Sequence, residues 1–168
     1  MSTAPPAAFY CAEQYRPDGS VGFLMRRVMQ SVVQQVDRRL AQHELTHAQW
    51  VPLFKLLMGP GSTVAELARE IQLDPGAVTR ALDRLEAKGL VQRVRSSTDR
   101  RVVQLVLTEH GRSLAAMVPA VLSEVLNGHL AGFSAAEHTA LLDMLQRMLA
   151  NGCALREQEG NASLSDGE

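Results

Sequence analysis

The middle of this 168-residue chain contains the pattern that most restricts its fold. Thr63 and Glu66 have the spacing of a capping box, which predicts the start of a short helix. Asp74 followed by Pro75 is typical of an N-cap and a first helical position, and Gly89 is typical of a helix end. Two short helices joined by a tight turn predict a helix-turn-helix unit.

The second of these helices has two distinct faces. At 100° per residue its apolar side chains share one arc, which contains Val78, Ala81, Leu82 and Leu85. The side chains on the opposite arc are small at the start of the helix and mostly basic further on. They are Gly76, Thr79, Arg80, Asp83 and Arg84. The apolar arc predicts packing in the core, so we expect the basic arc to face solvent.

Two segments rich in Val and Leu follow at residues 90–95 and 101–107. They alternate in part and are joined by a polar stretch, which predicts a β-hairpin. Thr108 then predicts the N-cap of a further helix. A hairpin placed directly after two such helices predicts a winged helix-turn-helix domain at residues 46–108.

Amphipathic helices are predicted on both sides of this domain. Apolar residues at spacings of three and four predict a long helix from Ser20 to about Gln42 and a short one from Gln49 to Leu57. Thr46 is the predicted N-cap of the short helix.

The same spacing predicts two more helices before residue 150, with a kink at Pro119 and a capping box at Ser134 and Glu137. The apolar stripes exceed what one small domain covers, so they predict a dimerisation region formed by residues 20–45 and 109–150. The remaining ends are predicted to be an N-terminal arm at residues 1–19 and a flexible tail at residues 151–168.

Composition supports a mainly α fold, because 46% of the residues are hydrophobic and only 4% are aromatic. No apolar run approaches the roughly 20 residues that span a bilayer, and the start of the chain lacks the pattern of a signal peptide. We therefore expect a cytoplasmic protein with no membrane partner. Cys11 and Cys153 predict neither a disulfide scaffold nor a zinc site, so no cofactor is expected.

Basic charge is concentrated in one stretch, although the whole chain has a net charge of −1. Seven basic and three acidic residues lie between Thr79 and Arg101. Clustered cations neutralise phosphates, so this stretch predicts binding to double-stranded DNA. Gly76 and Ala77 allow close approach of the backbone, and Arg80 can pair with O6 and N7 of guanine. The candidate DNA-contacting residues in this helix are Asp74, Gly76, Ala77, Thr79, Arg80 and Arg84.

Three local patterns resemble the MarR (multiple antibiotic resistance regulator) family of winged helix-turn-helix transcriptional regulators. They are Leu45–Trp50, Val78–Arg93, and the segment Asp99–Arg101 followed by Leu107–Gly111. The resemblance covers about residues 20–150. It implies a homodimer formed by the first and last two helices, with two winged domains reading a pseudo-palindromic operator. Members of the family are transcriptional regulators, so the resemblance implies that the protein is not an enzyme. Repression is the commoner mode of regulation in the family, so the resemblance implies a repressor.

The resemblance also implies roles at the tip of the hairpin, which in the family enters the minor groove. Ser97 lies at this tip, Arg100 would be the inserted cation, and Asp99 would form an ion pair with Arg101 that shapes the hairpin. Readout at this position would sense mainly groove width and A·T content.

Most members of the family release DNA when an aromatic or phenolic acid binds between the dimerisation helices and the winged domain. A small aromatic or heteroaromatic carboxylate would pair with arginine or protonated histidine and stack on tryptophan. The candidate effector-binding residues are Trp50, His47, His43, Arg27 and Arg38. Each of them could instead be a core or surface residue.

Cys11 supports an alternative hypothesis of redox sensing, because some members of the family carry a reactive cysteine before the first long helix. Its neighbours Tyr10, Glu13 and Tyr15 offer nothing that would stabilise a thiolate. An unreactive thiol in the arm is therefore the favoured interpretation.

Residues 43–47 spell the H-E-x-x-H signature of zinc metalloproteases, with His43 and His47 as ligands and Glu44 as the base. That chemistry needs one continuous helix through all five residues. Thr46 is predicted to be an N-cap, which breaks such a helix, so metalloprotease activity is the less favoured alternative.

Overall fold

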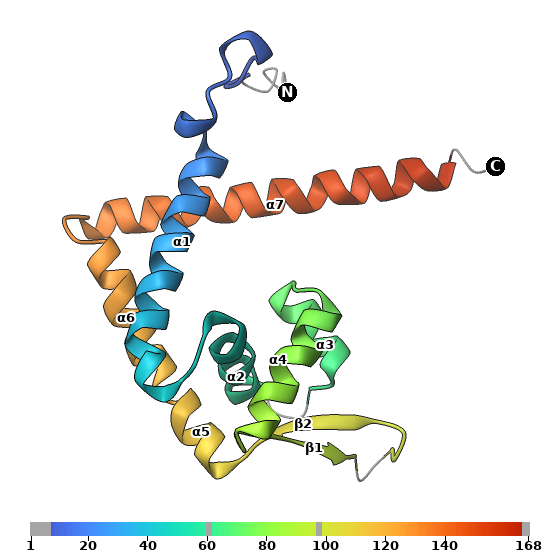
Figure 1. Ribbon diagram of the computed structural model, residues 1–168. Helices are drawn as coiled ribbons and strands as arrows, with labels where there is room; N and C mark the ends of the chain where they lie inside the picture. The colour runs from blue at the N-terminus through green and yellow to red at the C-terminus, as the bar shows by residue number, and fades with distance from the viewer. Residues whose placement is uncertain (1–7, 60–61, 97–98, 166–168) are drawn as a thin grey trace. The chain divides into compact units, whose positions relative to one another are not determined.

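The computed structural model describes residues 8–59, 62–96 and 99–165, with side chains up to residue 158 (Figure 1). The helices and strands are α1 (Val21–Leu40), α2 (His47–Met58), α3 (Val64–Ile71), α4 (Pro75–Ala87), β1 (Val91–Arg95), β2 (Val103–Leu107), α5 (Glu109–Ala115), α6 (Val118–His129) and α7 (Ala135–Ser165). The predicted mainly α fold with one β-hairpin is confirmed. The chain forms two compact units, one up to Leu126 and one from Asn127 onward.

The first unit has one hydrophobic core that draws side chains from α1 through to α6. The largest fully buried side chains are Val36, Leu40, Leu45, Leu53, Leu56, Leu67, Val78, Leu82, Leu85, Leu90, Leu105 and Val118. Burying one such side chain contributes about 1.5–3 kcal/mol. Because α1 to α6 and both strands all contribute, this core determines how α3, α4 and the hairpin lie beside one another (Figure 1).

Helix α4 begins and ends where the sequence predicts. The Asp74 side chain accepts a hydrogen bond from the backbone N–H of Ala77 at 2.9 Å, and Pro75 is the first helical residue. Gly89 follows the helix with a φ of 67°, in the left-handed region that favours glycine. The predicted apolar arc of α4 is buried, and it comprises Val78, Ala81, Leu82 and Leu85.

The start of α3 also follows the predicted pattern. The side chain of Thr63 accepts from the backbone N–H of Glu66 at 3.2 Å, and the Glu66 carboxylate accepts from the backbone N–H of Thr63 at 2.8 Å. Hydrogen bonds from the Thr63 backbone and hydroxyl lower the pKa of Glu66 below its ordinary value. The capping box is therefore present as predicted.

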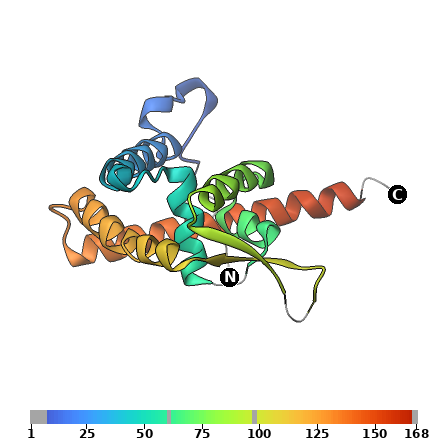
Figure 2. The ribbon, with the colours of Figure 1, turned by 60° about the horizontal axis from the view of Figure 1, so that its bottom comes forward.

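Strands β1 and β2 form an antiparallel hairpin that projects away from the helices of the first unit (Figure 2). Val91 pairs with Leu107 at its base, and Arg95 pairs with Val103 towards its tip. The backbone N–H of Leu105 donates to the carbonyl of Ser62 at 2.9 Å, which ties β2 to the segment before α3.

Thr108 and Gly111 join the hairpin to α5. The Thr108 hydroxyl donates to the carbonyl of Gly89 at 2.7 Å and accepts from the backbone N–H of Gly111 at 2.9 Å. A Cβ atom at Gly111 would lie 1.9 Å from the carbonyl oxygen of Leu90. Glycine is therefore required at this position, because α5 begins directly against the segment that follows α4.

The structure corrects the predicted course of two helices. The sequence predicts a kink at Pro119, whereas α5 ends at Ala115 and α6 begins at Val118, so the helix is broken. Pro119 is the second residue of α6, where its missing N–H costs no helical hydrogen bond.

The second correction concerns the tail predicted at residues 151–168, because α7 continues to Ser165. Residues 151–165 contain no proline and include the good helix formers Ala, Leu, Arg, Glu and Gln, which extend a helix without any tertiary packing signal. The capping box predicted before α7 is present, with the backbone N–H of Ser134 donating to Glu137 at 2.7 Å. Across the ranges that the structure describes, no helix is both long and apolar enough to cross a membrane.

Replacing Gly111 with alanine is expected to reduce the free energy of unfolding by about 1–3 kcal/mol, because the added methyl group would overlap the backbone of Leu90. Chemical denaturation followed by circular dichroism measures the change. Gly128→Ala in α6 is the matched control, since a Cβ at that position meets nothing within 4 Å. Equal unfolding free energies for the two variants would contradict the close approach at Gly111.

Candidate nucleic-acid interface

The outer face of α4 and residues 99–101 between the two strands are exposed parts of the first unit. Most of the residues predicted to contact DNA are solvent-exposed there, namely Asp74, Gly76, Thr79, Arg80, Arg84, Asp99, Arg100 and Arg101. Ala77 is half-buried, and Ser97 lies outside the described residues. The fold thus presents the predicted basic arc to solvent.

Arg80 and Arg84 are the cations of α4 that stay available for a ligand. Among the described residues neither guanidinium has a hydrogen bond or an ion pair. A Cβ at Gly76 would lie 3.5 Å from Nη1 of Arg80 and 3.1 Å from the Asp74 carboxylate, so the guanidinium lies over the first turn of the helix. The glycine leaves this first turn open to a close approach by another molecule.

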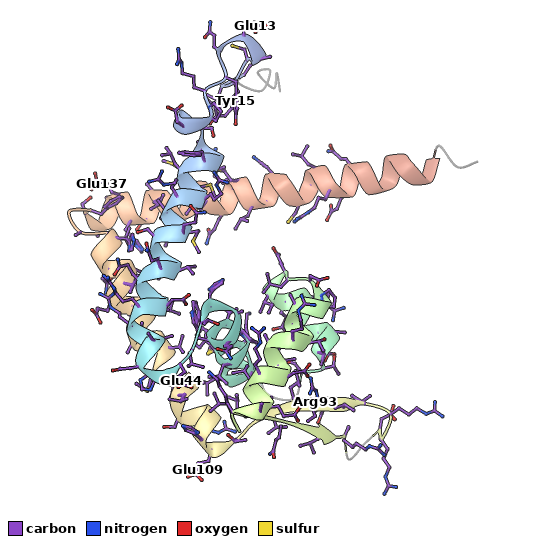
Figure 3. All side chains as sticks on the ribbon, viewed as in Figure 1. Glu13, Tyr15, Glu44, Arg93, Glu109 and Glu137 are labelled. Atoms are coloured by element: carbon purple, nitrogen blue, oxygen red, sulfur yellow. The ribbon has the colours of Figure 1, made fainter. Side chains whose placement is uncertain are left out.

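Arg93 on β1 has a role that the sequence analysis missed (Figure 3). Its Nη2 atom lies 2.7 Å from the Asp83 carboxylate, and its Nη1 atom donates to the carboxylate of Glu86. The hydrogen bond with Asp83, followed by the charge of Glu86, raises the pKa of Arg93 above its ordinary value despite partial burial. Strand alternation could have revealed this residue, because Arg93 shares a face with the buried Val91 and therefore requires acidic partners.

The hairpin tip has a different stabilising interaction from the one that the resemblance implied. The Asp99 carboxylate accepts a hydrogen bond from the backbone N–H of Arg101 at 2.9 Å, and no ion pair with the Arg101 guanidinium forms. Aspartate commonly bonds to backbone two residues further on in turns. The expected ion pair is therefore wrong, and the guanidinium groups of Arg100 and Arg101 are both exposed.

Two of the candidate effector-binding residues contact each other. The rings of His47 and Trp50 meet edge to face with centroids 5.0 Å apart, and Trp50 is only 6% exposed. The indole N–H of Trp50 donates to the carboxylate of Asp37 at 2.8 Å, a partner that the sequence analysis missed. Nδ1 of His47 is buried and has no hydrogen-bond partner in the part of the chain that the structure describes.

The other candidate effector-binding residues do not join this pair. Arg27 is exposed and lies over the ring of Phe23, about 15 Å along α1 from Asp37. Arg38 is exposed and follows Asp37 directly, and His43 lies within hydrogen-bonding distance of Gln42. The structure therefore brings Trp50 into contact with His47 and Asp37. Arg38, the residue after Asp37, is the cation closest to Asp37 in the sequence.

The H-E-x-x-H residues lack the continuous helix that metalloprotease chemistry needs. His43 ends a short 3₁₀ turn, Glu44 has a left-handed φ of 55°, and His47 begins α2. The Glu44 carbonyl instead accepts a hydrogen bond from Lys88 Nζ at 2.5 Å, which ties this turn to the end of α4. Within the described residues no three His, Cys, Asp or Glu side chains gather as a metal site.

Cys11 is a free, exposed thiol at the start of the short turn Ala12–Gln14. It therefore has the accessibility that redox sensing requires, and that alternative stays a prediction.

Helices α3 and α4 are joined by a tight turn and followed by a β-hairpin, and α4 exposes a cationic face. These features define a winged helix-turn-helix protein. The MarR family profile matches residues 45–103. The chain belongs to the MarR family.

Known relatives agree with this assignment. HTH-type transcriptional regulator TtmR of Methylorubrum extorquens is 39% identical over 109 residues, which are 65% of this chain and 55% of TtmR. The chain thus spans about half the length of that relative. The crystal structure of transcriptional regulator PA3341 has 32% identity and a TM-score of 0.71, over 79% of this chain and 97% of PA3341.

A further solved structure is that of BpsR from Bordetella bronchiseptica, whose DNA binding is regulated by 6-hydroxynicotinic acid. It has 27% identity and a TM-score of 0.71, over 80% of this chain and 96% of BpsR.

Proposed function

We propose that this protein is a transcriptional regulator that binds double-stranded DNA through α4 and the β-hairpin. The observation that carries this proposal is the exposed face of α4, where Arg80 and Arg84 have no partner within the described residues. Arginines left unpaired on a rigid helix are suited to phosphate oxygens and to guanine edges. The exposed Arg100 and Arg101 add cationic charge at the hairpin tip.

The first turn of α4 is suited to entering a major groove. In helix-turn-helix proteins the N-terminal residues of the second helix contact base edges while neighbouring groups contact the backbone. Gly76 leaves this turn open, and Thr79 donates its hydroxyl to the Pro75 carbonyl at 2.8 Å, so its oxygen can still accept from a base. Arg80 lies over this turn and is the expected base-contacting residue.

We infer that the protein acts as a homodimer on a pseudo-palindromic operator. The first half of α1 exposes a run of apolar side chains, which are Val21, Leu24, Met25, Val28 and Met29. Helix α7 has its own exposed apolar residues, which are Leu142, Met144, Met148, Leu149 and Leu155. Exposed apolar surface of this extent is typical of protein interfaces. Sedimentation velocity is expected to give twice the mass of the chain, and a monomer at micromolar concentration would contradict the dimer.

Replacing Arg80 with alanine is expected to weaken binding by about 1–3 kcal/mol, roughly 5- to 150-fold, because one bidentate base contact is lost. The duplex is obtained by selecting bound sequences from a random pool, and affinity is measured by fluorescence anisotropy at fixed salt.

Arg112→Ala is the matched control for this experiment, because Arg112 is an exposed arginine on α5 with no partner in the described part of the chain. It is expected to change affinity by less than about twofold, since it removes one charge away from α4. The proposal would be contradicted by a wild-type protein that selects no sequence, or by equal affinities for Arg80→Ala and Arg112→Ala.

We further propose repression that is relieved by a small aromatic or heteroaromatic carboxylate bound near His47 and Trp50. The buried Nδ1 of His47 lacks a hydrogen-bond partner within the described residues, and a ligand oxygen would satisfy it. Regulation of BpsR by 6-hydroxynicotinic acid supports an effector of this class. Trp50 is mostly buried, so the ligand is expected to meet the edge of this aromatic pair rather than stack broadly on the indole.

A panel of aromatic acids that includes 6-hydroxynicotinic acid is expected to release the selected duplex and to change the fluorescence of Trp50, the single tryptophan of the chain. His47→Ala should raise the acid concentration needed for release by about tenfold or more, because a hydrogen bond to a charged group is lost. His110→Ala, an exposed histidine on α5, is the control. Absence of release across the whole panel, or unchanged release in His47→Ala, would remove this proposal.

A further inference from the structure

Helix α4 carries two carboxylates beside the cations that the proposed function directs at DNA. Asp83 lies in the outer arc with Arg80 and Arg84, and Glu86 flanks that arc. Both side chains are exposed. Carboxylates that face a phosphate backbone without a partner oppose binding, because like charges repel across an interface. The helix therefore needs a means of compensating these two charges.

A single residue outside the helix compensates both carboxylates. Arg93 on β1 holds Asp83 through Nη2 at 2.7 Å and Glu86 through Nη1, and its backbone N–H donates to Glu86 at 3.4 Å. The arginine side chain is 29% exposed, less than either acid. The planar guanidinium is suited to this geometry because it offers donors in two directions at once.

Because Asp83 forms its ion pair with Arg93, it does not pair with Arg80. Arg80 and Asp83 are three residues apart on one helix, a spacing at which opposite charges pair. In the structure Asp83 pairs with Arg93 instead, and among the described residues Arg80 has no ion pair. The guanidinium that we expect to read DNA is thus left available by a contact made from the hairpin.

We propose that Arg93 is a positioning residue for DNA binding, which holds Asp83 and Glu86 away from DNA and leaves Arg80 unpaired. This inference rests on the proposed function. Arg93 itself does not touch DNA, since both terminal nitrogens of its guanidinium are already bound to carboxylates. The same contacts join α4 to β1 and help to keep the helix and the hairpin in one arrangement.

A four-protein cycle tests this role, using the duplex selected from a random pool. Arg93→Ala is expected to weaken binding by at least about tenfold in the wild-type background, because two uncompensated carboxylates then face phosphate. In the Asp83→Asn/Glu86→Gln background the same substitution is expected to change affinity by less than about twofold, because no charge remains to compensate. Exposed ion pairs contribute little to stability, so all four proteins are expected to remain folded.

An equal loss in both backgrounds would overturn the proposal, because it would mean that Arg93 contacts DNA or acts only through the fold. No loss in the wild-type background would overturn it as well. If circular dichroism shows that Arg93→Ala is unfolded, Arg93→Lys replaces it in the cycle, since one ammonium cannot hold both acids in the same way. Arg80→Ala is measured in parallel. If Arg80→Ala binds the duplex as tightly as the wild type, the proposed function is refuted. If Arg80→Ala loses affinity while Arg93→Ala keeps the wild-type affinity, only the positioning role is refuted.

Discussion

Burial of one face of α4 fixes the orientation of this helix and therefore which of its side chains face solvent. Val78, Leu82 and Leu85 are each at most 1% exposed, so the helix cannot rotate about its axis without exposing them to water. Burying three such side chains contributes several kcal/mol, about 1.5–3 kcal/mol each. The opposite face, with Arg80 and Arg84, is therefore held outward by the burial of these side chains.

Two contacts in the C-terminal half of α4 and at its C-cap connect this helix to the rest of the first unit. Arg93 joins it to β1, and Lys88 joins its C-terminal end to Glu44 in the turn before α2. Helix α2 also carries His47 and Trp50, so the proposed effector site lies on the element that follows this turn.

Local signals in the sequence predicted the fold well. The caps at Asp74, Thr63 and Thr108 and the glycine at 89 depend on neighbouring residues, so they can be recognised without knowing the fold. The buried arc of α4 follows from helical periodicity in the same way. The mainly α fold, the hairpin and the exposed basic arc were therefore all predictable.

Long-range contacts were not predictable in this way. Arg93 pairs with residues seven and ten positions away on another element, and Trp50 pairs with Asp37 across thirteen positions. Partner choice in such pairs depends on tertiary packing, which one sequence does not reveal. The length of α7 differs from the prediction for another reason: the polar composition of its last residues predicts disorder, whereas several of them are good helix formers and continue the helix.

The proposed mode of DNA binding requires two copies of α4 to enter neighbouring major grooves of one duplex. A hydroxyl-radical footprint on the selected duplex tests it most directly. We expect two protected half-sites on the same face of the duplex, with centres about 10 base pairs or a multiple of that distance apart. A single protected half-site, or uniform protection without such spacing, would contradict it.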